Sequence, residues 1–254
     1  MSLYRNIAKK RKRIAAGSGE KMRKPGTKAH QLQMHLNKQL KLPRKRRNNM
    51  SEAMKKLQER CGAGADGHFG KNTAKAIAEH YELSNERAAH LMGQASHESG
   101  HWRHTRENLN YSAESMMRVW PSRFPDLASC EGYSRNPSAL ANKVYGGRMG
   151  NNTESDGETF IGRGFLELTG KNNYRLFSSD MGLPEIMTDP DLVSTDYAFD
   201  TALWFFQKNK LFDIADDGVN DETILKITRR VNGGVHGIVD RTGETNKIYE
   251  WLTS

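Results

Sequence analysis

Cysteine is scarce in this chain of 254 residues, and long apolar runs are absent from it. The two cysteines, Cys61 and Cys130, are too few for the disulfide framework of a small secreted domain, so the composition fits folding in a reducing cytoplasm. No apolar run approaches the roughly 18 residues of a membrane span. The basic N-terminal region also lacks the apolar stretch of a secretory signal, so we expect a protein made in the cytoplasm without a signal peptide.

Acidic and aromatic residues are nearly missing from residues 1–50. This segment holds 16 of the 39 Lys and Arg, with Glu20 as its one acidic and Tyr4 as its one aromatic residue. The lack of aromatic rings for base stacking disfavours a dedicated nucleic-acid-binding module. The net charge of +15 instead predicts a basic, flexible arm over residues 1–50. Such an arm is attracted to anionic envelope polymers such as lipopolysaccharide or a phosphate-bearing wall polymer, and to nucleic acid.

Residues 51–83 have the pattern of two short helices separated by a glycine-rich turn. The string from Asp66 to Thr73, Asp-Gly-His-Phe-Gly-Lys-Asn-Thr, resembles the small helical peptidoglycan-binding module that accompanies many wall hydrolases. This resemblance predicts a wall-binding module over residues 51–83. The alternative is a helical hairpin that only packs on the next domain.

A third helix is predicted to begin after Leu83, with Ser84 as its N-cap, and to run to Ser99. Gly100 favours its end, because glycine is unfavourable inside helices and enriched just after them. The stretch at this end, His97-Glu98-Ser99-Gly100-His101, fits two kinds of site.

One of these sites is the zinc motif H-E-x-x-H, in which His97 and His101 project from one helical face and Glu98 polarises a water. Gly100 weakens the required helical turn, and His101 is expected to begin a loop. Residue 107, where the longer motif has a third histidine, is Glu107. A zinc peptidase is therefore the alternative interpretation.

The other site is a pair of carboxyl groups, Glu98 and Glu107, of the kind that glycosidases use. The strings Ala95–Trp102 and Glu107–Ser112 resemble the catalytic centre of glycoside hydrolase family 19, especially its phage endolysin branch. Further blocks of the family pattern follow in order: Ala141–Tyr145, Arg148–Asn152, Asp156–Gly157, Gly162–Gly170, Asn173–Tyr174, Val231–Gly234 and Asp240–Arg241. The resemblance extends over residues 84–254.

This resemblance implies roles for three residues: Glu98 as general acid, Glu107 as general base, and Thr169 as a residue that helps to hold the water. It implies a single displacement that inverts the anomeric carbon. It also implies a mainly α, lysozyme-like catalytic domain over residues 84–254, with two lobes and a substrate groove between them. Neither a cofactor nor a metal is required.

Seven further residues are predicted to bind substrate: His97, Tyr111, Arg163, Glu167, Asn173, Asn232 and Arg241. The asparagine amides can donate to and accept from sugar hydroxyl and N-acetyl groups. Each arginine either orients a catalytic carboxylate or closes a structural ion pair, and Tyr111 either packs in the core or stacks on a sugar. Glu167 departs from the family, which usually has Gln there, and a third carboxylate is expected to change neighbouring pKa values or the sugar substituents tolerated.

The sequence therefore predicts an endolysin-type glycoside hydrolase that cleaves β-1,4 bonds of bacterial peptidoglycan, with chitin as the close alternative substrate. A non-catalytic wall-binding protein is the remaining alternative. We expect a monomer that reaches the wall after release during phage lysis, or from the virion. The aromatic stretch 197–206 is predicted to be core, with no chemistry for Trp204 or Phe205.

Overall fold

The computed structural model describes residues 44–254, and side chains from Glu52 onward. Within this range the chain is built from α-helices, short 3-10 helices and loops, and its only β-type pairing is two isolated bridges, Arg106 with Arg163 and Arg163 with Leu168. Residues 1–43 of the predicted basic arm lie outside the described residues, and helix α3 begins at Arg44.

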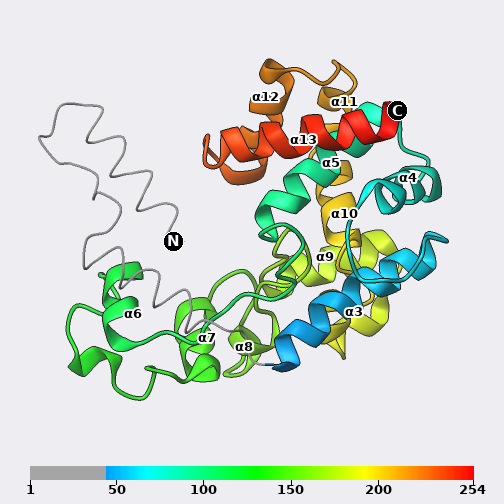
Figure 1. Cartoon of the computed structure of the whole chain (residues 1–254). Helices are drawn as coiled ribbons and strands as arrows, with labels where there is room; N and C mark the ends of the chain where they lie inside the picture. The colour runs from blue at the N-terminus through cyan, green and yellow to red at the C-terminus, as the bar shows by residue number, and fades with distance from the viewer. Residues whose placement is uncertain (1–43) are drawn as a thin grey trace, which may run out of the picture.

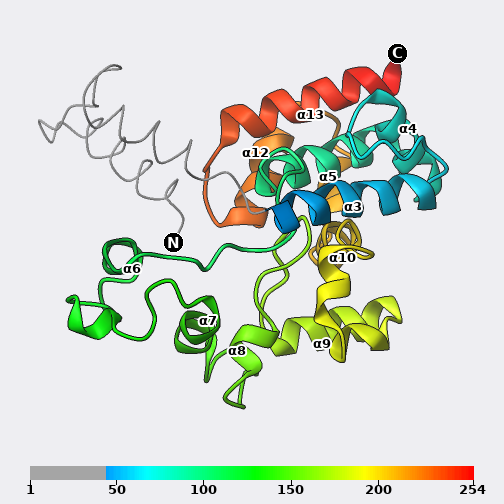
Figure 2. The same cartoon turned by 60° about the horizontal axis from the view of Figure 1, so that its bottom comes forward.

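The helices form two lobes that are separate in both cartoon views (Figures 1 and 2). The large lobe contains α3 (Arg44–Arg60), α4 (Lys71–His80), α5 (Asn85–Glu98), α10 (Asp200–Lys208), α11 (Leu211–Ala215), α12 (Asp221–Asn232) and α13 (Ile238–Thr253). The small lobe contains α6 (Ala113–Val119), η1 (Ala128–Cys130), α7 (Pro137–Tyr145) and α8 (Asp156–Thr159). Helix α9 (Lys171–Met181) and the 3-10 helices η2 (Pro184–Met187) and η3 (Pro190–Ser194) pack beside α10. The prediction of a mainly α, two-lobed domain is confirmed.

Helix α5 forms the centre of the large lobe because apolar and small residues surround it on all sides. Ala88, Leu91, Met92 and Ala95 are completely buried. The aromatic stretch predicted as core is also largely buried, with Phe199 and Phe206 in the same hydrophobic cluster as α5. The small lobe has a core of its own, made by Leu109, Met116, Phe124, Cys130, Leu140, Ala141, Val144 and Ile161.

The two helices of residues 51–83 share the core of the large lobe. Leu57 of α3 and Ile77 of α4 are buried in the cluster that contains Leu91. Phe69, from the turn between the two helices, stacks on Trp102 with ring centroids 4.3 Å apart. The hydrophobic core is therefore continuous across residue 83, and the wall-binding role of residues 51–83 stays a prediction.

The chain leaves α5 through a left-handed turn that directs it towards the small lobe. Ser84 caps the start of the helix, as predicted, by accepting a hydrogen bond from the Arg87 amide. The helix ends at Glu98, and Gly100, His101 and Trp102 follow with positive φ angles of 63°, 59° and 62°. His101 and Trp102 are not glycine, so this conformation is unfavourable locally. It is held in place because the Trp102 ring is buried between aromatic neighbours.

Helices α5 and α13 approach closely at Gly93. A Cβ atom at residue 93 would lie 2.2 Å from Thr245 Oγ1 and 2.9 Å from Thr245 Cα. We expect Gly93→Ala to force the helices apart and to destabilise the protein by about 1–3 kcal/mol, which thermal unfolding would detect as a lowered Tm. The control is Gly243→Ala in α13, where a Cβ would meet nothing within 4 Å and helix propensity alone should raise stability by up to about 1 kcal/mol. Equal changes in Tm for the two variants would contradict the close contact between α5 and α13.

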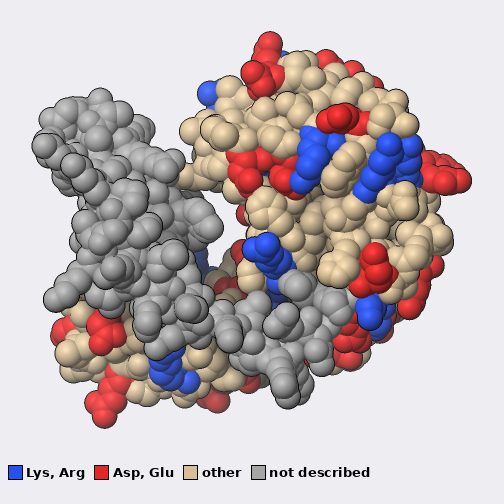
Figure 3. Space-filling view, viewed as in Figure 1, with Lys and Arg blue, Asp and Glu red and all other residues tan. Residues whose placement is uncertain are grey.

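Acidic and basic side chains are interspersed over the face of the large lobe in Figure 3, and ion pairs such as Lys247 with Glu244 lie along α13. The net charge of residues 51–254 is −6, so the basic character of the protein belongs to the N-terminal segment.

In the part of the chain that the structure describes, the helices are too short or too polar to cross a membrane.

Candidate active site

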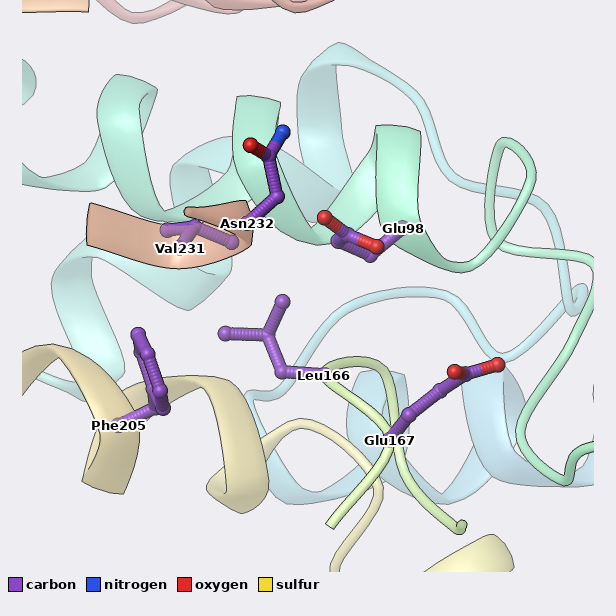
Figure 4. A pocket seen from close by; sticks show the side chains of 6 residues that line it. All are labelled: Glu98, Leu166, Glu167, Phe205, Val231 and Asn232. Carbon is purple, nitrogen blue, oxygen red and sulfur yellow. The ribbon is translucent and has the colours of Figure 1, made fainter. Parts of the chain in front are cut away.

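A pocket of about 230 Å³ opens at the C-terminal ends of α5 and α12. Figure 4 shows Glu98 on one side of it and Glu167, from the loop before α9, on the opposite side. The pocket is lined by Glu98, Leu166, Glu167, Phe205, Val231 and Asn232. Two carboxyl groups thus face an enclosed space whose other walls are mainly apolar.

Glu98, the last residue of α5, is held by Arg241 from α13. The Arg241 guanidinium donates to the Glu98 carboxylate and to the Gln94 side chain, and its Nε donates to the His236 carbonyl at 3.0 Å. Arg241 is only 1% exposed. Its donors are used inside the protein, which favours the role of orienting the Glu98 carboxylate, and substrate binding by Arg241 stays a prediction.

Glu107 lies after the left-handed turn and is held by two hydrogen bonds at its carboxylate. The Tyr145 hydroxyl donates to one oxygen at 2.7 Å, and the Gly162 amide donates to the other at 2.6 Å. The Glu107 amide in turn donates to the Gly162 carbonyl at 2.9 Å. Each carboxylate oxygen therefore has a fixed partner, and the orientation of the group is set by α7 and by the loop after α8.

Thr169 is brought next to Glu107 by Gly162. A Cβ on residue 162 would lie 3.1 Å from the Thr169 hydroxyl oxygen and 3.4 Å from the Glu107 carboxyl carbon. The Thr169 hydroxyl donates to the Glu167 carbonyl at 2.8 Å, and the Asn173 side chain donates to the Thr169 carbonyl at the same distance. Thr169 and Glu107 thus both lie against Gly162, and the Asn173 side-chain amide fixes the backbone of Thr169.

Glu167 has a backbone φ of 46°, a left-handed conformation that glutamate adopts rarely. It is exposed to solvent and lines the pocket. Partial desolvation there, followed by the charges of Glu107 and Glu98, raises the pKa of Glu167 to about 7. Burial, followed by the charges of Glu107 and Glu167, raises the pKa values of Tyr111 and Tyr145.

The remaining predicted residues support the site to different degrees. Asn232 lines the pocket, but its side chain also fixes the following loop by donating to the His236 carbonyl at 3.0 Å and accepting from the Gly234 amide at 2.8 Å. His97 Nδ1 lies 2.5 Å from Asp240, so its ring is engaged by α13. Tyr111 packs on Trp120 with ring centroids 5.0 Å apart, which favours the packing role.

The buried Arg163 closes an ion pair, and its predicted role in substrate binding stays a prediction. It is 3% exposed, and its guanidinium forms an ion pair with Asp191, with nitrogen–oxygen distances of 2.7 and 2.9 Å. It also donates to the Thr159 carbonyl at 2.8 Å and to the Tyr174 hydroxyl at 3.1 Å. Arg163 therefore ties the loop beside Glu107 to the segment around η3.

The sequence missed two features of the site. Phe205, assigned wholly to the core, is only partly buried and lines the pocket with Leu166 and Val231. Tyr145, which is not among the predicted site residues, is a hydrogen-bond donor to Glu107. An aromatic stripe at helical spacing carries no signal that separates a pocket wall from core.

The geometry that the zinc motif requires is not formed. Helix α5 ends at Glu98, so His97 and His101 do not project from one helical face. Among residues 52–254, no group of three or more His, Cys, Asp and Glu side chains is arranged to hold a metal ion.

Comparisons with known proteins identify the family of this chain. The family model described as Chitinase class I, of glycoside hydrolase family 19, matches residues 73–212, which is more than half of the chain. A glycosyl hydrolase family 19 domain-containing protein of Haemophilus influenzae is 32% identical over 191 residues, covering 73% of this chain and 90% of that protein. The chain belongs to glycoside hydrolase family 19. It is therefore a glycoside hydrolase, and the match begins inside the segment 51–83.

More distant relatives of this family 19 glycoside hydrolase include plant enzymes. An endochitinase of Arabidopsis thaliana is 36% identical over 80 residues, which cover 31% of this chain and 26% of that protein. The crystal structure of chitinase C from Streptomyces griseus aligns with 82% of this chain and 95% of that one, at 14% identity and a TM-score of 0.46.

Proposed function

We propose that this glycoside hydrolase cleaves β-1,4 bonds of bacterial peptidoglycan by a single displacement, with Glu98 as general acid and Glu107 as general base. The observation that carries the proposal is the pair of carboxyl groups with separate, rigid supports. Arg241 holds Glu98 on the large lobe, and Tyr145 helps to hold Glu107 on the side of the small lobe. Inverting glycosidases use two carboxyl groups on opposite sides of the scissile bond in this way.

In the proposed reaction, the Glu98 carboxyl group gives its proton to the glycosidic oxygen as the bond to the anomeric carbon breaks. The Glu107 carboxylate removes a proton from a water molecule, and the water oxygen attacks the anomeric carbon from the opposite face. Thr169 lies next to Glu107 and supplies a hydroxyl to position this water. The products are a sugar with inverted anomeric configuration and a free alcohol, and proton exchange with solvent restores both glutamates.

The choice of peptidoglycan is supported by the likeness to endolysin motifs and by a bacterial relative that the chain matches over 90% of its length. Chitin is the second candidate, because several relatives are described as endochitinases. We further propose that the protein acts as a monomeric phage lysin, after release or from the virion. The charge of +15 on residues 1–50 would hold it on an anionic envelope.

Mass spectrometry of digests tests the substrate. Purified peptidoglycan and N-acetylglucosamine oligomers would be incubated with the protein, with and without EDTA, and the new ends identified. We expect new saccharide ends from peptidoglycan that are insensitive to EDTA. Cleavage of the chitin oligomers alone would replace peptidoglycan by chitin, and cleavage of peptide bonds that EDTA abolishes would overturn the glycosidase mechanism.

A further inference from the structure

Glu167 is the one carboxylate of the site without a partner among the described residues. Glu98 is paired with Arg241, and Glu107 accepts from Tyr145 and Gly162. In residues 52–254, no Lys or Arg forms an ion pair with the Glu167 carboxylate, and no donor forms a hydrogen bond to it; only its main-chain groups are bonded. The Glu167 carboxylate is therefore not used by the described part of the chain and is free to accept from a charged donor of a ligand.

The backbone fixes the direction of this unpaired group. The Glu167 carbonyl accepts from the Thr169 hydroxyl at 2.8 Å, and its amide donates to the Gly164 carbonyl, which hold the residue at its positive φ. In Figure 4 Glu167 lies on the opposite side of the pocket from Glu98, and its carboxyl group points away from Leu166 and Phe205. Strained backbone of this kind persists where the surrounding structure enforces it, and it is enriched at functional sites.

The electrostatic field at Glu167 is complementary to a positive charge. Desolvation and the neighbouring charges of Glu107 and Glu98 raise its pKa to about 7, because all three groups are acidic. The one guanidinium close to the pocket, that of Arg241, already donates to Glu98 and Gln94. The carboxyl groups are not arranged to hold a metal ion in the described part of the chain. The missing cation is therefore best supplied by a bound organic molecule.

We propose that Glu167 makes the site selective for glycan units that carry a free amino group, so that de-N-acetylated glucosamine is preferred over N-acetylglucosamine at the position above Glu167. The apolar wall of Phe205, Leu166 and Val231 accepts the face of a sugar ring, and the ammonium group at C2 donates to the Glu167 carboxylate. This inference rests on the proposed function only in assuming that the pocket receives the glycan chain.

Binding measurements test this inference without depending on cleavage. Calorimetry at pH 7 and low salt would compare the glucosamine hexamer with the N-acetylglucosamine hexamer, for the wild type and Glu167→Gln. We expect the wild type to prefer the glucosamine hexamer, and Glu167→Gln to reduce that preference about tenfold, because one charge-assisted contact is lost. The preference should also shrink in high salt. Glu79→Gln, an exposed glutamate on α4, is the matched control and should leave the preference unchanged.

A second variant controls for the possibility that Glu167→Gln changes the preference by disturbing the strained backbone. Glu167→Asn removes the carboxylate with a residue that tolerates positive φ, so it should reduce the preference by a similar factor while unfolding cooperatively. An unchanged preference in both variants would overturn the inference. If the protein shows the Glu167-dependent preference but cleaves no glycan, the proposed function is contradicted. The inference about binding is then still supported.

Discussion

Replacing Glu98 by glutamine should lower kcat on the natural glycan about a thousandfold, because glutamine cannot deliver a proton to the glycosidic oxygen. The substitution keeps the size of the side chain and an oxygen that accepts from Arg241, so the structure around α5 should persist. Initial rates of reducing-end formation on a defined oligosaccharide measure the loss. Circular dichroism and a melting curve show whether the variant is folded.

The leaving group reveals whether the lost function is that of an acid. An activated aryl glycoside releases a stable phenolate and needs little proton transfer, so Glu98→Gln should cleave it with a much smaller loss, roughly tenfold or less. An equal loss on the aryl glycoside and the natural glycan would contradict the assignment of Glu98 as general acid. Glu79→Gln is the control for a neutralised glutamate away from the site, and it should retain wild-type rates on both substrates.

The local part of the site could be predicted from the sequence because its signals are local. Ser84 and Gly100 mark the two ends of α5, and the structure has the helix from Asn85 to Glu98. Capping and glycine conformations depend on neighbours a few residues away, so a single sequence contains the required information. The position of Glu98 at a helix end, next to a turn that leads to Glu107, follows from these signals.

The roles of the two arginines could not be predicted, because their partners are distant in sequence. Arg241 meets Glu98 across 143 residues, and Arg163 meets Asp191 across 28. The sequence left each arginine with the same two options, to orient a catalytic carboxylate or to close a structural ion pair. Only the packing of α13 against α5 gives Arg241 the first role, while the burial of Arg163 beside η3 gives it the second.

The roles of the aromatic residues could not be predicted from the sequence either. Phe69 belongs to a string that resembles a wall-binding motif, yet its ring stacks on Trp102 in the core of the large lobe. Phe205 lies in a stripe typical of core, yet it lines the pocket. Tyr145 is identified as a partner of Glu107 only by the distance between their oxygens. An aromatic ring serves packing, sugar contact or hydrogen bonding equally well, and the tertiary environment selects among these.

Removal of the Glu107 side chain should have the second large effect. We expect Glu107→Ala to lower kcat about a thousandfold, because alanine cannot take a proton from the attacking water. The Tyr145 hydroxyl and the Gly162 amide would lose their acceptor but remain in place as a polar cavity. Azide, a small anion that attacks without losing a proton, should enter this cavity and restore part of the rate.

The anomer that the wild type first releases decides between the mechanisms, because a single displacement of a β-linked substrate gives the α-anomer and a covalent intermediate gives the β-anomer. Nuclear magnetic resonance of the product distinguishes the two anomers, and first release of the β-anomer would contradict the inverting assignment. The azide product of Glu107→Ala is a second check, since an α-glycosyl azide is expected if Glu107 is the general base and also if it were a nucleophile, whereas a β-glycosyl azide fits neither role. Glu98→Gln should gain nothing from azide on the natural glycan, because its missing proton must still reach the glycosidic oxygen, so rescue confined to Glu107→Ala would separate the roles of the two glutamates.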